Sequence, residues 1–401
     1  MALSITAEVN PTLLIWAREQ SGYPAELIAK RLGVSVARLE AWELGRRKPT
    51  VRQIQELARR YRRPFGVFFL PQPPSVPPLA SEYRRLPGVD AGAESPEFRL
   101  AIRVMAQRRQ TSLELADELG ASIPVFSISA RLSQGPRAVG QRLREVVGPS
   151  VDEQFAWRDD WQAWRSWRSS VEAAGIMVSQ FPKVPLDQAR GVSLLELPLP
   201  VIGINSREQS PAARSFTLLH ELVHIALALG HDERVALQET RNEREWMAVE
   251  RFAEEAASEA LVPEATLNEV LSNAARDAHW WDIAEVRKLA SKFRVTPLAM
   301  ATRLRIAGVL TWDEYRRWRE AWDGYVATLK PRKGGPTSPV DKSLGRNGRP
   351  FAQLVLEAFD ANRITAVDAS RHLDLRFDHF DDLRRELRLG SSDRRGLDVG
   401  E

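Results

Sequence analysis

The feature that most constrains this chain is a strongly apolar helical segment, 216–229, which carries two histidines and a glutamate. Its first twelve residues read Phe-Thr-Leu-Leu-His-Glu-Leu-Val-His-Ile-Ala-Leu. A helix this apolar is expected to lie inside a protein core. Polar and ionisable groups are costly to bury unless they have partners. If they are buried, His220, Glu221 and His224 therefore need a compensating partner; the alternative is a helix whose two histidines face solvent.

The spacing of the two histidines predicts a metal site. His220 and His224 are four residues apart, so both rings project from one side of a helix. The chain has no cysteine, so a metal must be held by His, Asp or Glu, and two neutral imidazoles suit Zn²⁺. Glu221 is turned by about 100° around the helix axis. It can face a water on the metal and take its proton, which is the role of a general base.

A third protein ligand is expected on the next helix, 243–261. A metzincin-type continuation is excluded, because Leu227 and Gly230 stand where its Gly and His belong. His231 comes one residue late and lies ~16 Å along the axis from His220. The following helix offers Glu250, Glu254 and Glu255 among small alanines that allow close approach. Glu250 and Glu254 share one face, so either can be the ligand while the other binds a histidine N–H.

The first 63 residues have the spacing of a helix-turn-helix. Apolar residues recur at helical intervals, Gly22 and Gly33 mark helix ends, and Ser35 and Thr50 mark helix starts. This segment holds 12 Lys and Arg against 6 Glu, although the whole chain has a net charge of only +4. A basic N-terminal module favours an anionic partner such as nucleic acid.

The remaining chain is divided by composition. A proline-rich stretch at 71–78 predicts an extended connector, and Gly175–Phe181 and Leu199–Asn205 predict strands. Trp157, Trp161, Trp164 and Val171 form a helical stripe that we interpret as core. The predicted domains are a helix-turn-helix at 1–75, a helical connector at 76–130, a main domain at 131–328, a Gly/Pro/Lys linker at 329–349 and a small helical unit at 350–401. Signal-peptide and transmembrane patterns are not expected, which is compatible with the cytoplasm.

Several motifs, in a fixed order, resemble the ImmA/IrrE-type metallopeptidases that carry an N-terminal XRE-type helix-turn-helix. The likeness runs through most of residues 11–325. Its pieces are Trp42–Thr50, Arg63–Leu70, Tyr83-Arg84, Arg190–Ser193, Pro200–Asn205, Arg214–His224 and Glu250–Pro263.

This resemblance implies a mainly α fold with a small β-sheet (α+β). It combines a five-helix N-terminal domain, a gluzincin-like peptidase domain and a small C-terminal helical unit. It implies His220, His224 and Glu250 as zinc ligands and Glu221 as catalytic base, and leaves Glu254 as an alternative ligand or a partner of a ligand. A substrate strand is expected along the sheet edge near Pro200–Asn205.

The resemblance also implies partners. In XRE-type domains the second helix of the pair enters the major groove of double-stranded DNA, which gives Ser35 and Arg38 to the bases. Arg46, Arg47 and Lys48 are then phosphate contacts. The implied function is a regulatory zinc endopeptidase that cleaves a repressor or a toxin/antitoxin-related protein, with no membrane partner; a homodimer is allowed. The competing interpretation is a non-proteolytic transcriptional regulator or antitoxin that uses the peptidase fold to sense a partner.

Overall fold

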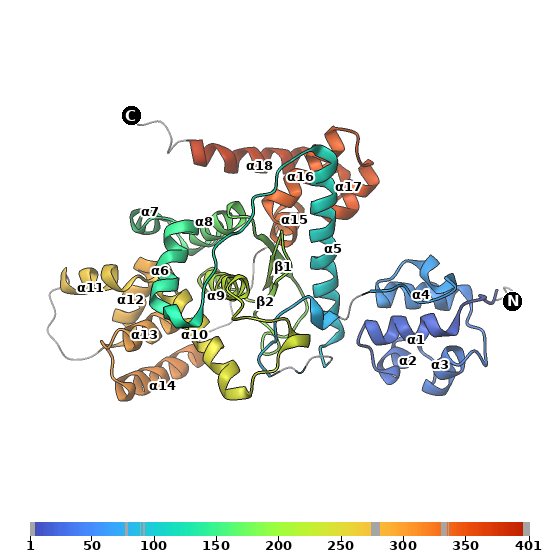
Figure 1. The fold of residues 1–401 in the computed structure, drawn as a ribbon, viewed down its shortest axis with the longest axis horizontal. Coiled ribbons are helices and arrows are strands. Elements are labelled where there is room, and N and C mark those ends of the chain that lie inside the picture. Colours follow the sequence, from blue (N-terminus) through green and yellow to red (C-terminus); the bar gives the residue numbers. More distant parts are fainter. Residues whose placement is uncertain are drawn as a thin grey trace.

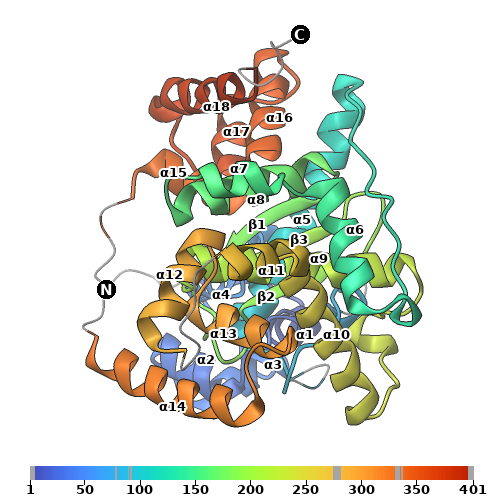
Figure 2. The same ribbon diagram turned by 90° about the vertical axis from the view of Figure 1, so that its left-hand side faces the viewer.

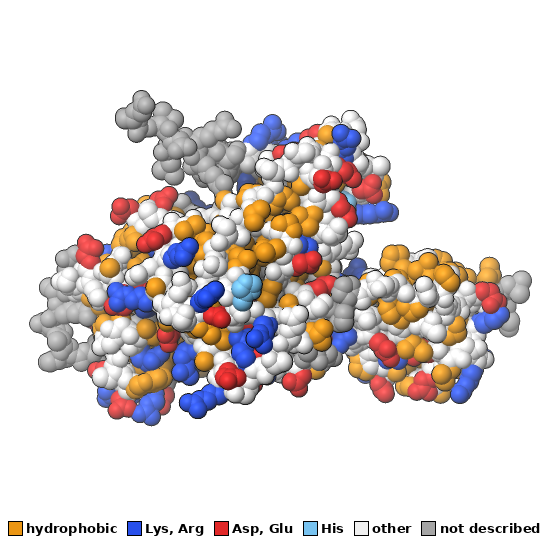
Figure 3. Space-filling model, viewed as in Figure 1, with side chains coloured by type: hydrophobic (Ala, Val, Ile, Leu, Met, Phe, Trp, Pro, Cys, Tyr) orange, Lys and Arg blue, Asp and Glu red, His pale blue; other side chains and the backbone are white. Residues whose placement is uncertain are grey.

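The fold is mainly α with one small β-sheet, as the resemblance implies (Figure 1). It is given by a computed structural model that describes residues 5–76, 79–88, 90, 93–273, 281–329, 335 and 337–395. A lobe formed by the first four helices stands at one side of a larger body, and the space-filling view shows the same separation (Figure 3).

The N-terminal lobe contains a helix-turn-helix. Ser35 caps one helix by accepting a hydrogen bond from the Arg38 amide, and Thr50 forms a capping box with Gln53. Gly33 ends the preceding helix with φ of +67°. Trp42 is buried in the lobe core, as predicted. The elements are α1 (Pro11–Gln20), α2 (Ala25–Leu32), α3 (Val36–Glu43), α4 (Val51–Tyr61) and the 3₁₀ helix η1 (Phe65–Phe69).

The body is built around a three-stranded sheet with the order β1-β3-β2. The strands are β1 (Met177–Phe181), β2 (Gly191–Leu194) and β3 (Val201–Asn205); β3 is parallel to β1 and antiparallel to β2. The expectation of a substrate strand near Pro200–Asn205 is therefore wrong. That segment is the central strand, and its backbone groups pair with β1 on one side and with β2 on the other. β2, which we did not predict as a strand, supplies the edge nearest the histidines.

Helices cover both faces of the sheet. On one face lie α8 (Asp160–Ala173) and α9 (Pro211–Leu229); on the other lies the long helix α5 (Pro96–Leu119). The remaining helices of the main domain lie on the side of α9 away from the sheet, and most of them are in front of α9 in Figure 2. They are α6 (Pro136–Val147), α7 (Val151–Ala156), α10 (Glu243–Leu261), α11 (Glu264–Asn273), α12 (Ile283–Phe293), α13 (Pro297–Ile306) and α14 (Trp312–Thr328).

α9 is the core helix that the sequence predicted. Among the described residues it is long and apolar enough to span a membrane, but 72% of its apolar window is buried inside the fold. The tryptophan stripe beside it is core at Trp157, Trp164 and Val171. Trp161 is the exception: it is 47% exposed, beneath the Arg214 guanidinium. The prediction failed there because the buried face of α8 runs through Trp164, Trp167 and Val171, and Trp161 lies to one side of that face.

The C-terminal helices share a core with the body. They are α15 (Pro339–Asn347), α16 (Arg349–Asp360), α17 (Ala366–Leu373) and α18 (Phe380–Arg395). α16 packs on α5, and α15 packs on β1. Nine of the 21 residues expected as a linker, 329–349, therefore form helix α15. Because this range is rich in glycine and proline, its sequence does not predict a helix, yet Val340 and Leu344 of α15 join the core.

Candidate functional site

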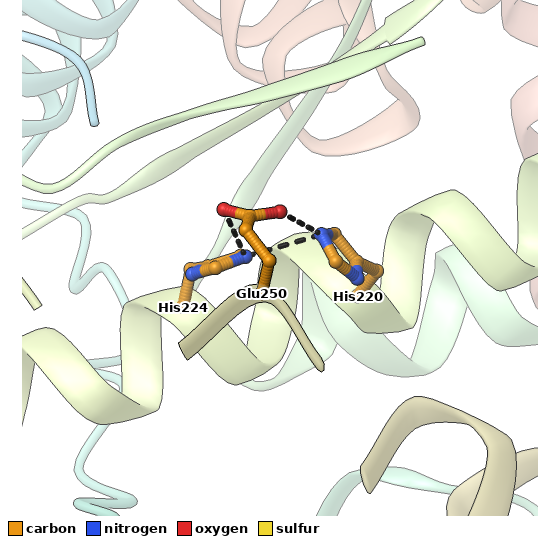
Figure 4. Close-up of side chains that lie close together, drawn as sticks. All are labelled: His220, His224 and Glu250. Carbon is orange, nitrogen blue, oxygen red and sulfur yellow. Dashed lines mark hydrogen bonds and ion pairs between the residues drawn. The ribbon is translucent and has the colours of Figure 1, made fainter. Parts of the chain in front are cut away.

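Two helices bring the predicted metal ligands together. His220 and His224 project from one side of α9, and Glu250 reaches them from α10 (Figure 4). One ligand atom from each residue lies within 4.8 Å of the others. The alanine face of α10, at Ala253, Ala256 and Ala257, is fully buried and lets the helix pack closely. The convergence predicted from spacing is thus present in the fold.

The separations of these atoms are close to those between the ligands of a tetrahedral ion, with one Glu250 oxygen facing each ring. The two Nε2 atoms are 3.1 Å apart. Glu250 Oε2 is 3.4 Å from His220 Nε2, and Glu250 Oε1 is 3.6 Å from His224 Nε2. Zinc–ligand bonds of about 2.0–2.2 Å at tetrahedral angles put ligand atoms roughly 3.3–3.5 Å apart. A hydrogen bond between the rings would explain the first distance alone, but not a carboxylate that faces both rings.

A buried carboxylate that sequence reasoning missed orients His224. Glu233, in the loop after α9, accepts a 2.6 Å hydrogen bond from His224 Nδ1 and is held by Arg241 at 2.7 Å. Burial alone would raise the pKa of Glu233, but its bond to His224 holds it at about 2. Burial also lowers the pKa of His224 and favours the neutral ring. A proton on Nδ1 leaves the Nε2 lone pair free for a metal.

The candidate catalytic base, Glu221, is hydrogen-bonded by Arg84, which is distant in the sequence. Arg84 donates to both oxygens of Glu221, at 3.1 and 2.9 Å, and to Glu250 Oε1 at 2.8 Å. Ser193 on β2 donates a further bond of 2.5 Å to Glu221 Oε2. Burial by itself would raise the pKa of Glu221, but the Arg84 guanidinium more than offsets it and the pKa is lowered.

The remaining candidate ligand, Glu254, lies near His220 and Glu250. It is exposed and is not among the three residues whose ligand atoms converge. Glu233, rather than Glu254, is the carboxylate that binds a ligand histidine. His220 Nδ1 is buried and has no hydrogen-bond partner in the described part of the chain. Tyr83-Arg84 is one of the motifs that carry the family resemblance, but nothing in its sequence predicts a contact with Glu221, 137 positions away.

The predicted DNA contacts lie on the surface of the N-terminal lobe. Ser35 and Arg38 at the start of α3 are exposed, and so are Arg46, Arg47 and Lys48 after it. The Arg38 guanidinium lies 6.0 Å over the Trp42 ring, while Lys48 forms an ion pair with Glu8. These cations are therefore available to an anionic partner, although Lys48 already has one neighbour of opposite charge.

Comparison with known families matches two parts of the chain. Residues 14–68 match the helix-turn-helix family, and residues 171–305 match the IrrE N-terminal-like domain, which belongs to a peptidase family. No curated protein matches the chain. The second match includes α9 and α10, and therefore all three converging ligands. The chain thus joins a DNA-binding module to a domain of a metallopeptidase family, which confirms the resemblance.

Proposed function

We propose that this chain is a cytoplasmic, DNA-binding regulatory zinc endopeptidase whose substrate is a protein such as a transcriptional repressor or a toxin/antitoxin-related partner. The observation that carries the proposal is the convergence of His220, His224 and Glu250 beside Glu221. A site with three protein ligands keeps one position open, as catalytic zinc sites do. The helix-turn-helix would place this activity at a DNA site.

The chemistry follows from the positions of the side chains. When bound, Zn²⁺ supplies a Lewis acid that makes water acidic and polarises a peptide carbonyl. Glu221 then takes a proton from the attacking water and returns it to the amine that leaves, so that one peptide bond and one water become an acid and an amine. His220, His224 and Glu250 would hold the ion, while Glu233 fixes the His224 ring. Ser193 orients the base.

A second function is favoured by one specific observation. Arg84 already occupies both oxygens of Glu221, so the base is engaged in the form described here. A protein that senses a partner without cutting it would retain such a closed site. The two functions differ in whether hydrolysis is required, and substitution of Glu221 separates them.

Metal analysis of the purified full-length protein tests the site. We expect one zinc per chain in the wild type and loss of zinc in His224→Ala and Glu250→Ala, because each removes a ligand. Glu233→Gln should keep the site but bind zinc about 10–100-fold more weakly in chelator competition, since it loses only a supporting contact. Glu254→Gln is the matched control. Zinc loss in this variant, with zinc retained in Glu250→Ala, would show that the third ligand is Glu254.

Glu221→Gln tests hydrolysis. It should keep zinc and abolish cleavage of a protein partner and the associated response in cells, because the amide cannot take a proton. If the cellular response is unchanged while zinc stays bound, the non-proteolytic function is the correct one.

A further inference from the structure

We propose that the connector strand, residues 83–86, is an internal occupant of the substrate position, and that Arg84 holds the site closed until this strand is displaced. The inference rests on the proposed function, because it concerns access to the same site. The connector strand then competes with an extended peptide substrate for the same position. Three sets of contacts support it: along the edge of β2, inside the site, and at the far side of the strand.

The connector strand extends the sheet at its edge beside the site. β2 pairs with β3 on one side; on the other side Tyr83 forms an antiparallel bridge with Leu194. The Arg84 amide donates a 3.2 Å hydrogen bond to the Ser193 carbonyl. Extended peptides commonly bind proteins by adding a strand to an open sheet edge. β2 lies directly over Glu221, so a substrate strand that added to its edge would need the place that Tyr83 and Arg84 take.

The loop after α9 contacts the other side of the connector strand. The Ala236 amide, in the loop after α9, donates a 2.7 Å hydrogen bond to the Tyr83 carbonyl, and Arg84 bridges to Val235. The slot between β2 and this loop is thus one extended chain wide. Since α15 covers β1 at the opposite side of the sheet, β2 is the edge that a substrate strand could reach.

The side chain of Arg84 enters the site itself. It is 3% exposed and bridges Glu221 and Glu250. Together with Ser193 it takes three of about four acceptor positions on the Glu221 carboxylate. Buried ion pairs contribute little to stability after desolvation, and apolar residues often replace them at no loss. A buried arginine between a base and a ligand therefore calls for a functional explanation, and control of access provides one.

The test uses the zinc-loaded full-length protein and a tripeptide hydroxamate, whose backbone can pair with β2 and whose hydroxamate binds zinc. We expect Arg84→Met to bind this probe at least about tenfold more tightly than the wild type, because the competing charge-assisted hydrogen bonds are gone. The matched control is Arg18→Met. Arg18 forms a two-bond ion pair with the buried Glu43 inside the N-terminal lobe, so its loss should leave probe affinity unchanged.

Hydrogen exchange in the wild type provides a second readout that needs no variant. Binding of the probe should accelerate deuterium uptake at residues 83–86, because the Arg84 amide loses its bond to Ser193. Equal affinity in wild type and Arg84→Met would overturn the proposal, and so would unchanged exchange at 83–86 in the probe-bound wild type. If Arg84→Met does not fold, the exchange result decides alone. A wild-type protein without zinc would instead contradict the proposed function, which metal analysis shows separately.

Discussion

Glu82, next to the connector strand, has a carboxyl group that is costly to ionise in the folded chain. Burial, assisted by the nearby Glu196 and opposed by Arg109, raises its pKa to about 7. Its Oε2 atom is buried without a hydrogen-bond partner among the described residues. Between about pH 4.5 and pH 7, Glu82 is therefore mainly protonated in the folded state and mainly ionised in the unfolded chain.

This preference predicts a pH-dependent stability. The contribution of Glu82 is fully present below about pH 4.5 and is lost as pH rises through about 7. Glu82→Gln should match the wild type at pH 4.5 and exceed its free energy of unfolding at pH 8. We expect a gain of about 1 kcal/mol, less than the full shift because water screens a partly exposed group. Urea denaturation at both pH values measures it; a difference independent of pH would contradict the assignment.

Residues that act through local spacing could be predicted from the sequence, and residues that act over a distance could not. His220, Glu221 and His224 follow from one helical turn, and a glutamate ligand on the next helix follows from the carboxylates that this helix carries. Arg84 and Glu233 have ordinary local surroundings, and their contacts depend on where the connector and the loop after α9 come to lie. Between Glu250 and Glu254, spacing alone left the choice open, because both lie on one helix face.

At the scale of elements, β2 packs so closely against α9 at Gly191 that only glycine fits there. A Cβ atom at Gly191 would lie 2.4 Å from Thr217 Cγ2 and 2.9 Å from Glu221 Cγ on α9. The small residue therefore lets the strand pack directly against the helix that carries the base. A four-residue strand with a glycine shows little periodicity, which explains why sequence reasoning quoted the Arg190–Ser193 motif without assigning a strand.

Gly191→Ala should therefore move β2 away from α9. We expect a loss of about 1–3 kcal/mol in the free energy of unfolding, typical of overpacking, and slower turnover because Ser193 and Glu221 separate. Zinc should remain bound, since the three ligands lie on α9 and α10. Gly324→Ala on α14 is the control, because its added Cβ meets nothing within 4 Å. Equal stability of the two variants would show that β2 can shift at no cost.

At the scale of the whole molecule, the N-terminal lobe is attached to the body through α5. Arg99 donates a 2.7 Å hydrogen bond to the Glu19 carbonyl, and Arg103 donates one of 3.2 Å to the Tyr61 carbonyl. Arg99 also pairs with Glu94 at 3.1 Å, and Glu94 accepts a bond from the Tyr83 hydroxyl. The order of modules could be predicted from sequence, but this junction joins α1, α4 and α5 through side chains with no local signature.

The exposed cations after α3 predict salt-dependent DNA binding. Replacing Arg46, Arg47 and Lys48 with alanine should weaken binding to double-stranded DNA. It should also reduce the slope of log affinity against log salt by up to about 2–3. Fluorescence anisotropy over a series of NaCl concentrations measures both. The control is the matched triple alanine variant of Arg316, Arg317 and Arg319 on α14, at the opposite end of the molecule from the lobe (Figure 1). An unaltered salt slope in the first variant would exclude these residues as phosphate contacts.

If the chain acts as the peptidase proposed above, the anchoring of the connector strand at both ends affects which substrates it selects. Along the chain one end leads to the lobe and the other leads to α5, and the Tyr83 hydroxyl is also bound to Glu94, so a displaced strand cannot diffuse away. A short tether holds such a segment at an effective concentration on the order of millimolar. A free peptide in solution must therefore compete with the connector strand at this effective concentration. A protein bound beside the lobe on the same DNA would have a local concentration comparable to that of the strand. Proximity, more than the sequence around the cleaved bond, would then decide which proteins are cut.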